Sequence, residues 1–456
     1  MTSSAHLADF DPSLIADRTY VTRRRFTTVD APAVLSLTIC LLTLFPAYLI
    51  VPGMTDLGRP ALVVAFLLGS WWIIARLSPR LMMVGPQPIR WVALVYVLSL
   101  LISYAVGFLR GLTTMEVNAA DRAMLGAIAF LGVMLIAADG IPNWERLQGV
   151  LRVFVWCSCF MAVIGLVQAL AYIDLTQQLL IPGLQPKGWI VGLEVRGGGV
   201  RVASTAFHYI EFSLIMVMAL PFAIHFARFA PTPRQRHLFA VAALLIAGAV
   251  PVTMSRTGFL ALAVVLAVLF PVWGWRLRYN MFVVGVGLLA AMAVAKPDVM
   301  NTITAIFLDA ENDPSVTART KRYEMVGQYF SQTPWLGRGT GTWVSPQYQY
   351  LDNQWLGTAL QNGWVGVAAL ASLYIGAVWL AGLALRRTAV VAERHLCACL
   401  IAVVLTGILA NATFDAFSFS TYSTILALML GLCGALWRFT HPARTVRTSA
   451  PLKADR

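Results

Sequence analysis

Long apolar segments recur along the whole chain and are separated by short polar connections. Each segment has about 16 to 30 residues, and a helix needs roughly 20 apolar residues to cross the hydrocarbon core of a bilayer. The pattern predicts an all-α polytopic membrane protein of about twelve transmembrane helices. The predicted spans are residues 32–51, 60–75, 91–109, 123–138, 153–173, 212–226, 238–253, 257–273, 279–295, 355–385, 396–414 and 417–437.

Two connections, residues 174–211 and 296–353, are much longer than the others. Long loops in a compact protein are usually functional, so we expect the chemistry of the protein to lie in them. The two segments that flank Ser255 and Arg256 are also compatible with one broken span, which would change the number of helices by one.

The second long connection contains the pattern of one further helix. Asp313 and Pro314 have the order of an N-cap and a first helical residue, and Pro334 ends the pattern. Apolar and aromatic residues recur at helical spacing between them. The sequence therefore predicts a short amphipathic helix that lies on the surface and carries Arg319 and Arg322.

Composition agrees with a protein that lies mostly in lipid. Hydrophobic residues make up 59% of the chain and charged residues only 12%, whereas about a quarter of the residues are charged in an ordinary water-soluble domain. We expect one membrane domain over residues 1–456, with polar tails at 1–31 and 438–456. All six cysteines fall inside apolar segments, so neither a disulfide framework nor a zinc site is indicated.

The formal net charge of +13 does not indicate binding to nucleic acid, because the basic residues lie between apolar spans and form no dense patch. Most of them fall in the segments that are cytoplasmic if the N-terminus is cytoplasmic, as the positive-inside rule requires. We expect both termini inside and both long loops outside. The first thirty residues lack the apolar core of a signal peptide, so we expect the first span to be retained.

The first candidate motif lies in the loop at 174–211. Arg196 and Arg201 flank three glycines and a valine, and His208 and Glu211 follow just before the next span. Glycines allow close backbone turns, and two guanidiniums above the membrane can form forked bonds to phosphate oxygens. An anchor to lipid headgroups is the alternative.

The second motif is Ser255-Arg256-Thr257-Gly258, which lies between two apolar segments with almost no loop. A charge so close to hydrocarbon is costly, so we expect Arg256 to face a hydrated cavity or a bound anion. An arginine that extends from a helix end to the membrane surface is an equally simple alternative.

The third motif is Gly337-Arg338-Gly339-Thr340-Gly341, and Asp352-Asn353 and Gln361-Asn362-Gly363-Trp364-Val365-Gly366 follow it. The glycine pattern follows no predicted strand and opens no dinucleotide-binding unit, so we interpret it as a tight turn beside a cavity. For Asp352 and Asn353 taken alone, capping of the next helix is the favoured interpretation.

The order of the three motifs and their predicted position on one side resemble the O-antigen ligase and O-antigen polymerase superfamily of bacterial envelope glycosyltransferases. In that family an arginine precedes a Thr-aromatic-x-His-Pro-Asn-like element. Arg201, Thr205, His208 and Glu211 match it here, with Tyr209 in place of the proline. Four further elements follow in that family. They are a Ser-Arg-Thr/Ser-Gly element, an external helix that carries arginine, a Gly-x-Gly turn, and a His-Asn-like pair before a Gly-x-x-Gly helix.

The resemblance implies the architecture of C-type glycosyltransferases and the transfer of a glycan from a polyprenyl-diphosphate carrier to an acceptor hydroxyl. The departing diphosphate gains negative charge, which fixed guanidiniums stabilise. We expect Arg201, Arg256 and Arg322 to bind it. The secondary candidates are Arg196, Arg319 and Arg338. The resemblance implies neither a cofactor nor a nucleotide sugar. A metal site is not indicated, because the external acids form no Asp-x-Asp pair.

The acceptor hydroxyl must lose a proton, and Asp352, His208 and Glu211 are the candidate bases. Asp352 is preferred for its position, although lipopolysaccharide ligases usually carry histidine there, which leaves the subtype open. The implied acceptor is a glycan, a lipid or a protein, and other polysaccharide-assembly proteins are possible partners.

The implied site of action is the external face of a bacterial inner membrane, in envelope polysaccharide biosynthesis. The sequence does not separate a polymerase of repeat units from a ligase. A transporter or flippase of a lipid-linked glycan is the alternative from another class. However, such proteins carry ionisable residues near the middle of their spans, and only His225 is so placed here.

Overall fold

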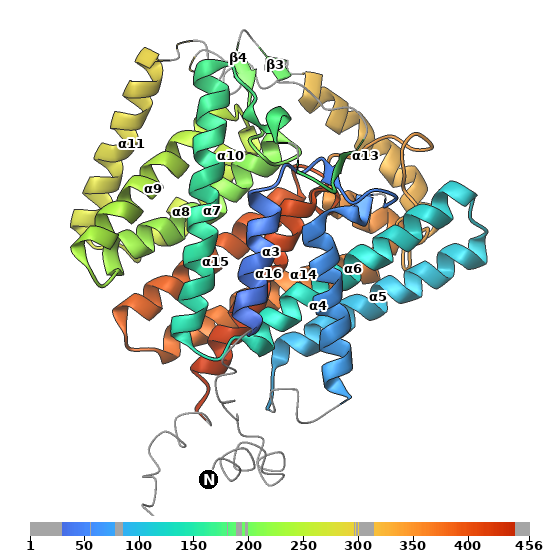
Figure 1. Ribbon diagram of the computed structural model, residues 1–456. Helices are drawn as coiled ribbons and strands as arrows, with labels where there is room; N and C mark the ends of the chain where they lie inside the picture. Colours follow the sequence, from blue (N-terminus) through green and yellow to red (C-terminus); the bar gives the residue numbers. More distant parts are fainter. Residues whose placement is uncertain are drawn as a thin grey trace, which may run out of the picture.

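The computed structural model describes residues 30–54, 56–77, 85–179, 181–187, 194–196, 199–295, 297, 300 and 314–442 (Figure 1). Thirteen α-helices lie within these residues. They are α3 (Ala31–Thr43), α4 (Pro60–Arg76), α5 (Pro88–Arg110), α6 (Thr114–Gly140), α7 (Trp144–Ala171), α8 (Tyr209–Phe229), α9 (Pro233–Val252), α10 (Arg256–Leu269), α11 (Trp275–Ala295), α13 (Pro314–Gln332), α14 (Gln354–Arg387), α15 (Val391–Asn411) and α16 (Ser420–Phe439).

All thirteen except α13 are apolar, and each of these twelve coincides with one predicted span. Nine are long and apolar enough to cross a membrane, and α3, α4 and α10 are shorter. The protein is therefore an all-α polytopic membrane protein, as the hydrophobic pattern predicts. Residues 253–255 separate α9 from α10, so the two segments that flank Ser255 and Arg256 form two helices and not one broken span.

Local sequence signals fix where most of these helices begin. Proline occupies one of the first two helical positions in α3, α4, α5 and α9, where its missing N–H costs nothing. Asp30, Thr113, Asn143 and Thr232 cap their helices by accepting a backbone N–H, and Glu116 completes a capping box with Thr113.

The predicted first span, residues 32–51, is wrong over residues 44–51. The helix α3 ends at Thr43, three residues before Pro46, whose ring and missing N–H oppose continuation. The apolar residues beyond it form strand β1 (Leu49–Ile50), which pairs with β2 (Gln185–Pro186) from the first long connection. That connection also holds the β3 (Glu194–Arg196) and β4 (Gly199–Arg201) hairpin.

The helices α8 and α16 lie at the centre of the bundle, where almost every side chain is buried. Glycines allow close contact around α16. A Cβ on Gly431 would lie 2.2 Å from the carbonyl oxygen of Met134 in α6. In contrast, α11 has no buried residue and lies at the edge of the bundle (Figure 1).

The bundle has two distinct ends. In Figure 1 the β3–β4 hairpin lies at the top, and the start of α3 and the end of α16 lie at the bottom. The lower ends are joined by an ion pair between Arg146 and Asp30 and by ring contact between Trp144 and Phe439. We call the upper end, which includes the starts of α8, α10, α14 and α16, the motif end.

Candidate functional site

The helix α13 confirms the predicted helix in the second long connection, although Asp313 lies outside the described residues. Val326 of α13 is buried against Leu351 and Leu360, which fixes the helix on the start of α14. One turn earlier, the Arg322 guanidinium forms an ion pair of 2.5 Å with the Asp352 carboxylate. This contact brings one predicted diphosphate ligand onto the preferred candidate base.

Asp352 has an unusual backbone conformation, with φ of 51°, in the left-handed region that few residues other than glycine adopt. Its N–H donates to Asp415 Oδ2 at 3.2 Å, and the N–H of Asn353 donates to Asp415 Oδ1 at 3.0 Å. Asn353 caps α14 by accepting the N–H of Leu356 at 3.1 Å. The capping interpretation therefore holds for Asn353, whereas the Asp352 side chain binds Arg322 instead.

Burial raises the pKa of Asp415 above that of an ordinary aspartate, and the nearby charge of Asp352 raises it further. The two backbone N–H groups and the charge of Arg322 act in the opposite direction. The short connection between α15 and α16 thus adds a second carboxylate beside the Arg322–Asp352 pair.

Arg201 closes strand β4 and is buried just before α8. Its guanidinium lies 4.2 Å from the centre of the Tyr209 ring and donates to the Tyr209 hydroxyl at 2.6 Å. Tyr209 is the residue that replaces the family's proline. The departure from the family pattern therefore supplies a cation–π and hydrogen-bond partner for the arginine.

His208 caps α8, because its Nδ1 accepts the N–H of Ile210 at 3.2 Å. The neutral ring then carries its proton on Nε2. The His208 ring also contacts Phe419, with 5.4 Å between the ring centres. The nitrogen that could accept a proton is thus engaged with the backbone.

Glu211 is completely buried in the first turn of α8. Its carboxylate accepts three backbone N–H groups, from Phe207 at 2.9 Å, Thr421 at 2.8 Å and Tyr422 at 3.0 Å. The side chain therefore links the start of α8 to the start of α16. Each oxygen of this candidate base therefore accepts at least one backbone N–H, which gives the carboxylate a structural contact with both helices.

Arg256 is the first residue of α10. Ser255 caps this helix by accepting the N–H of Gly258 at 3.3 Å. A Cβ on Gly258 would lie 2.8 Å from the Cβ of Ser213, so the start of α10 packs closely on the first turns of α8. The Ser-Arg-Thr-Gly motif thus places Arg256 at the motif end, as the predicted topology requires.

The third motif forms one unit with a break in α14. Gly363 has a φ of 64° inside this helix, so the helical hydrogen bonds are interrupted there. The N–H of Arg338 donates to the freed carbonyl of Leu360, and the N–H of Gly339 to that of Gln361, both at 2.9 Å. The glycine-rich turn therefore fills the break in a helix.

The same turn also satisfies the other side of the break. Trp364 and Val365 donate their N–H groups to the carbonyls of Pro334 at 2.8 Å and Trp335 at 3.2 Å. Gly337 has a φ of 71°, and a Cβ there would lie 2.3 Å from the backbone of Gln361. The glycines allow close approach of two backbones, which the sequence did not predict.

Arg338 extends from this turn into a group of aromatic residues. Its Nη2 donates to the Tyr348 hydroxyl at 2.9 Å, and its guanidinium lies 5.2 Å from the centre of the Tyr329 ring. Of the two remaining secondary candidates, Arg196 lies in β3 and Arg319 in the first half of α13.

The connection between α15 and α16 touches both halves of the candidate site. Phe419 contacts His208, and the N–H of Phe417 donates to Gln354 at 3.0 Å. Asp415 holds the backbone of Asp352. The Arg201 motif and the Arg322–Asp352 pair therefore lie on either side of one short segment.

Two residues at this end were missed in the sequence. Arg59 is buried and donates to Ser420 Oγ, Thr421 Oγ1 and the Leu42 carbonyl, each at 2.7 Å. Asp415 lies in no motif and is one of several acidic residues scattered through the predicted external segments. Their partners lie tens to hundreds of positions away along the chain, so no local motif could identify them.

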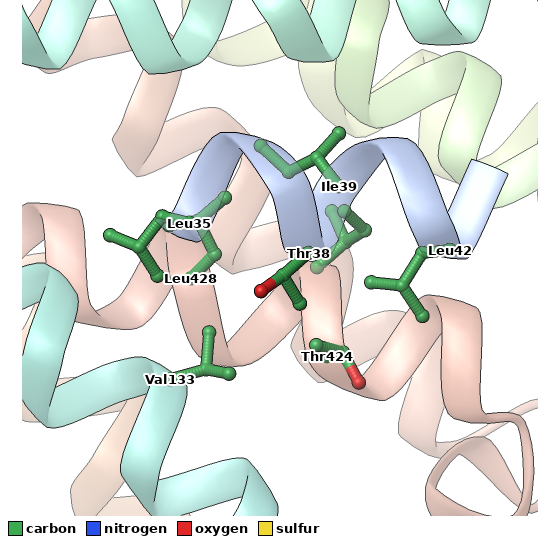
Figure 2. A pocket seen from close by; sticks show the side chains of 8 residues that line it. Leu35, Thr38, Ile39, Leu42, Val133, Thr424 and Leu428 are labelled. Carbon is green, nitrogen blue, oxygen red and sulfur yellow. The ribbon is translucent and has the colours of Figure 1, made fainter. Parts of the chain in front are cut away.

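Figure 2 shows a cavity inside the bundle between α3, α6 and α16. Leu35, Ile39, Leu42 and Leu428 line it, and Thr38 and Thr424 supply its hydroxyl groups. The lining carries no charged side chain, so this cavity does not have the chemistry of an anion site. In the part of the chain that the structure describes, no group of three or more His, Cys, Asp or Glu residues is arranged to hold a metal ion.

Comparison with known proteins gives one family match. No curated protein matches the chain. Residues 241–371, from α9 into α14, match the family described as O-antigen ligase. This segment contains Arg256, Arg322, Arg338 and Asp352. The chain therefore carries a domain of the O-antigen ligase family, which confirms the resemblance to the O-antigen ligase and polymerase superfamily.

Proposed function

We propose that the protein transfers a glycan from a polyprenyl-diphosphate carrier to an acceptor hydroxyl at the motif end of the bundle. The observation that carries this proposal is the Arg322–Asp352 ion pair inside the matched O-antigen ligase domain. It joins an anion-binding group to a proton acceptor, which are the two functions that the reaction requires.

In the proposed reaction the acceptor oxygen attacks the anomeric carbon of the donor sugar, and its proton passes to the Asp352 carboxylate. The bond between that carbon and the diphosphate oxygen breaks, and the diphosphate leaves with the electron pair. This single displacement inverts the configuration at the anomeric carbon. It needs no metal if arginines stabilise the charge of the leaving group.

Arg322, Arg256 and Arg201 are the proposed diphosphate ligands. All three belong to the motif end, and planar guanidiniums bind phosphate oxygens through paired hydrogen bonds. Arg201 is already held by Tyr209, so its orientation is fixed before the donor arrives. Arg196, Arg319 and Arg338 remain secondary candidates.

Asp352 is the proposed base. Its side chain is about half exposed, whereas both oxygens of the buried Glu211 and the Nδ1 of His208 are engaged with backbone N–H groups. An accessible carboxylate can reach an acceptor hydroxyl that enters from outside the protein.

We further propose that the motif end faces the exterior of the cytoplasmic membrane, with both termini in the cytoplasm. The acceptor is a glycan, a lipid or a protein, and both polymerisation and ligation fit the same chemistry. Gene deletion separates them. A lost polymerase leaves single repeat units on the acceptor, whereas a lost ligase leaves the acceptor bare.

The direct test uses the purified protein in liposomes that contain a defined polyprenyl-diphosphate oligosaccharide and an acceptor. We expect release of polyprenyl diphosphate and a longer or newly attached glycan, with equal rates with and without a metal chelator. Movement of the donor across the bilayer without glycan transfer would instead identify a flippase and refute the proposal.

A further inference from the structure

The connection between α15 and α16 is bonded to the start of α14 at several points beyond Asp415. Asn353 Nδ2 donates to the Ala412 carbonyl at 3.1 Å, and the N–H of Gln354 donates to the Phe414 carbonyl at 3.2 Å. Gln354 Oε1 accepts the N–H of Phe417 at 3.0 Å. Residues 352–354 are therefore held against one short segment of the chain.

Asp415 makes the contact with the backbone of Asp352 and Asn353. One carboxylate accepts two consecutive N–H groups, those of Asp352 and Asn353, with a different oxygen for each. A left-handed backbone costs a residue with a Cβ on the order of 1 kcal/mol or more, so it persists only where its surroundings impose it. The pair of bonds to Asp415 imposes this conformation on Asp352, whose φ is 51°.

The direction of the Asp352 side chain follows from that backbone conformation. With φ in the left-handed region the side chain extends to Arg322, whereas the next residue, Asn353, turns back to cap α14. The charged groups that act on Asp415 are Asp352 and Arg322. Hence Asp415, Asp352 and Arg322 form a chain of contacts from the α15–α16 connection to α13.

We infer that Asp415 is a positioning residue, which holds the backbone of Asp352 so that its carboxylate can accept the proton of the acceptor hydroxyl. This inference rests on the proposed function, since it assigns Asp415 to the same reaction. Asp415 does not itself touch the reacting atoms and acts through Asp352 alone.

The test compares Asp415→Asn with the unchanged protein in the reconstituted transfer assay. Asparagine keeps one acceptor oxygen but turns an NH₂ group toward the second N–H, so one of the two bonds is lost. We expect kcat to fall about 10²-fold, because a displacement of about 1 Å in a catalytic group costs that much. The KM for the donor should change by less than about threefold, since Arg201, Arg256 and Arg322 are unaltered.

The same change in an Asp352→Asn background separates positioning from a general effect on folding. If Asp415 acts through Asp352, then Asp415→Asn lowers kcat of the Asp352→Asn protein by less than about twofold, because contacting residues with one shared role are not additive. Additive losses would overturn the inference.

Asp174→Asn is the matched control. Asp174 also accepts a backbone N–H at the motif end, that of Thr176 at 3.1 Å, but it has no bond to Asp352. We expect this variant to keep the kcat of the unchanged protein. If Asp415→Asn does not fold, Asp415→Glu takes its place. A lower kcat with unchanged KM supports the inference, and an unchanged kcat overturns it.

The outcomes also distinguish this inference from the proposed function. If the unchanged protein releases no polyprenyl diphosphate, the proposed function fails. If the unchanged protein is active and Asp415→Asn equals it in kcat, only the positioning role fails.

Discussion

Arg322 and Asp352 neutralise each other in the structure, although each is proposed to act on a different substrate. Only 20% of the Arg322 side chain is exposed, compared with 46% of Asp352. The arginine is thus held by its surroundings, while the carboxylate remains open to an incoming group. A diphosphate that binds Arg322 would compete with Asp352 and leave the carboxylate available to the acceptor.

We predict that Arg322→Ala lowers kcat/KM for the donor about 10- to 100-fold, because a hydrogen bond to a charged group contributes about 1.5–3 kcal/mol. Arg322→Lys should restore only part of this loss, since an ammonium cannot form the paired bonds of a guanidinium. Arg256→Ala should also reduce transfer. Arg236→Ala, in the first turn of α9 at the opposite end, is the control. Full transfer by Arg322→Ala would remove this residue from the site.

Glu211 gives a contrasting prediction. In Glu211→Gln one of the three backbone N–H groups that the carboxylate accepts would face an NH₂ group. We expect a loss of folding stability of about 1–3 kcal/mol, which is the typical cost of an unsatisfied buried polar group. Thermal unfolding in detergent measures this loss, and the KM of the folded fraction should stay constant. A variant with unchanged stability and no turnover would return Glu211 to the candidate bases.

For single residues, the sequence identified the side chains proposed to act in the reaction, but it did not identify the residues that these side chains contact. Arg201, Arg256, Arg322 and Asp352 stand in recognisable local motifs. The buried Arg59, in contrast, obtains its partners only when α3, α4 and α16 meet. Such contacts depend on tertiary packing, which spacing along the chain does not encode.

Among the helices, α14 shows how the glycine-rich third motif stabilises the fold. It has 34 residues, or about 51 Å at 1.5 Å per residue, which exceeds the hydrocarbon thickness of about 30 Å. The break at Gly363 divides it into a short part at the motif end and a longer part that runs to Arg387. The turn from Pro334 to Gly341 supplies hydrogen bonds to both parts. Asp352 lies two residues before the start of the shorter part.

We predict that Gly363→Ala disrupts this arrangement. Its Cβ would lie 2.3 Å from the carbonyl group of Trp335, and its φ of 64° disfavours any side chain. The expected loss is at least about 2 kcal/mol of folding stability, measured as a lower unfolding temperature in detergent.

Gly382→Ala in the same helix is the control, because a Cβ there meets no atom within 4 Å. It should leave stability unchanged or raise it by up to about 1 kcal/mol. Equal stability of the two variants would contradict the role assigned to the break.

The sequence predicted twelve apolar helices and the additional helix α13, because long hydrophobic periodicity and an Asp-Pro start are strong local signals. It failed at the end of α3, where apolar residues continue beyond Pro46 into β1. It also did not predict that the turn at Gly337–Gly341 forms hydrogen bonds with the break in α14 next to Gly363. Both failures concern pairing between distant segments.

At the scale of the whole molecule, the candidate residues gather at one end of the bundle. The orientation of that end in the membrane can be measured with single cysteines. Tyr350, with 67% of its surface exposed, lies at the motif end, and Gly274 lies in the connection between α10 and α11 at the opposite end.

We predict that Tyr350→Cys reacts with a membrane-impermeant maleimide in intact cells, whereas Gly274→Cys reacts only after permeabilisation. The unsubstituted chain controls for its own six cysteines. The reverse pattern of labelling would place the motif end in the cytoplasm and contradict the proposed orientation.

The shortness of α10 has a consequence for the surrounding lipid. Its 14 residues span about 21 Å, about 9 Å less than a hydrocarbon core of about 30 Å, and local thinning of the bilayer is one way in which a membrane accommodates a short helix. Arg256, as the first residue of α10, would lie at the rim of such a thinned region. The headgroup of the proposed polyprenyl-diphosphate donor would then lie closer to Arg256 there than elsewhere in the membrane, and the shape of the bilayer would favour the approach of the donor to the protein.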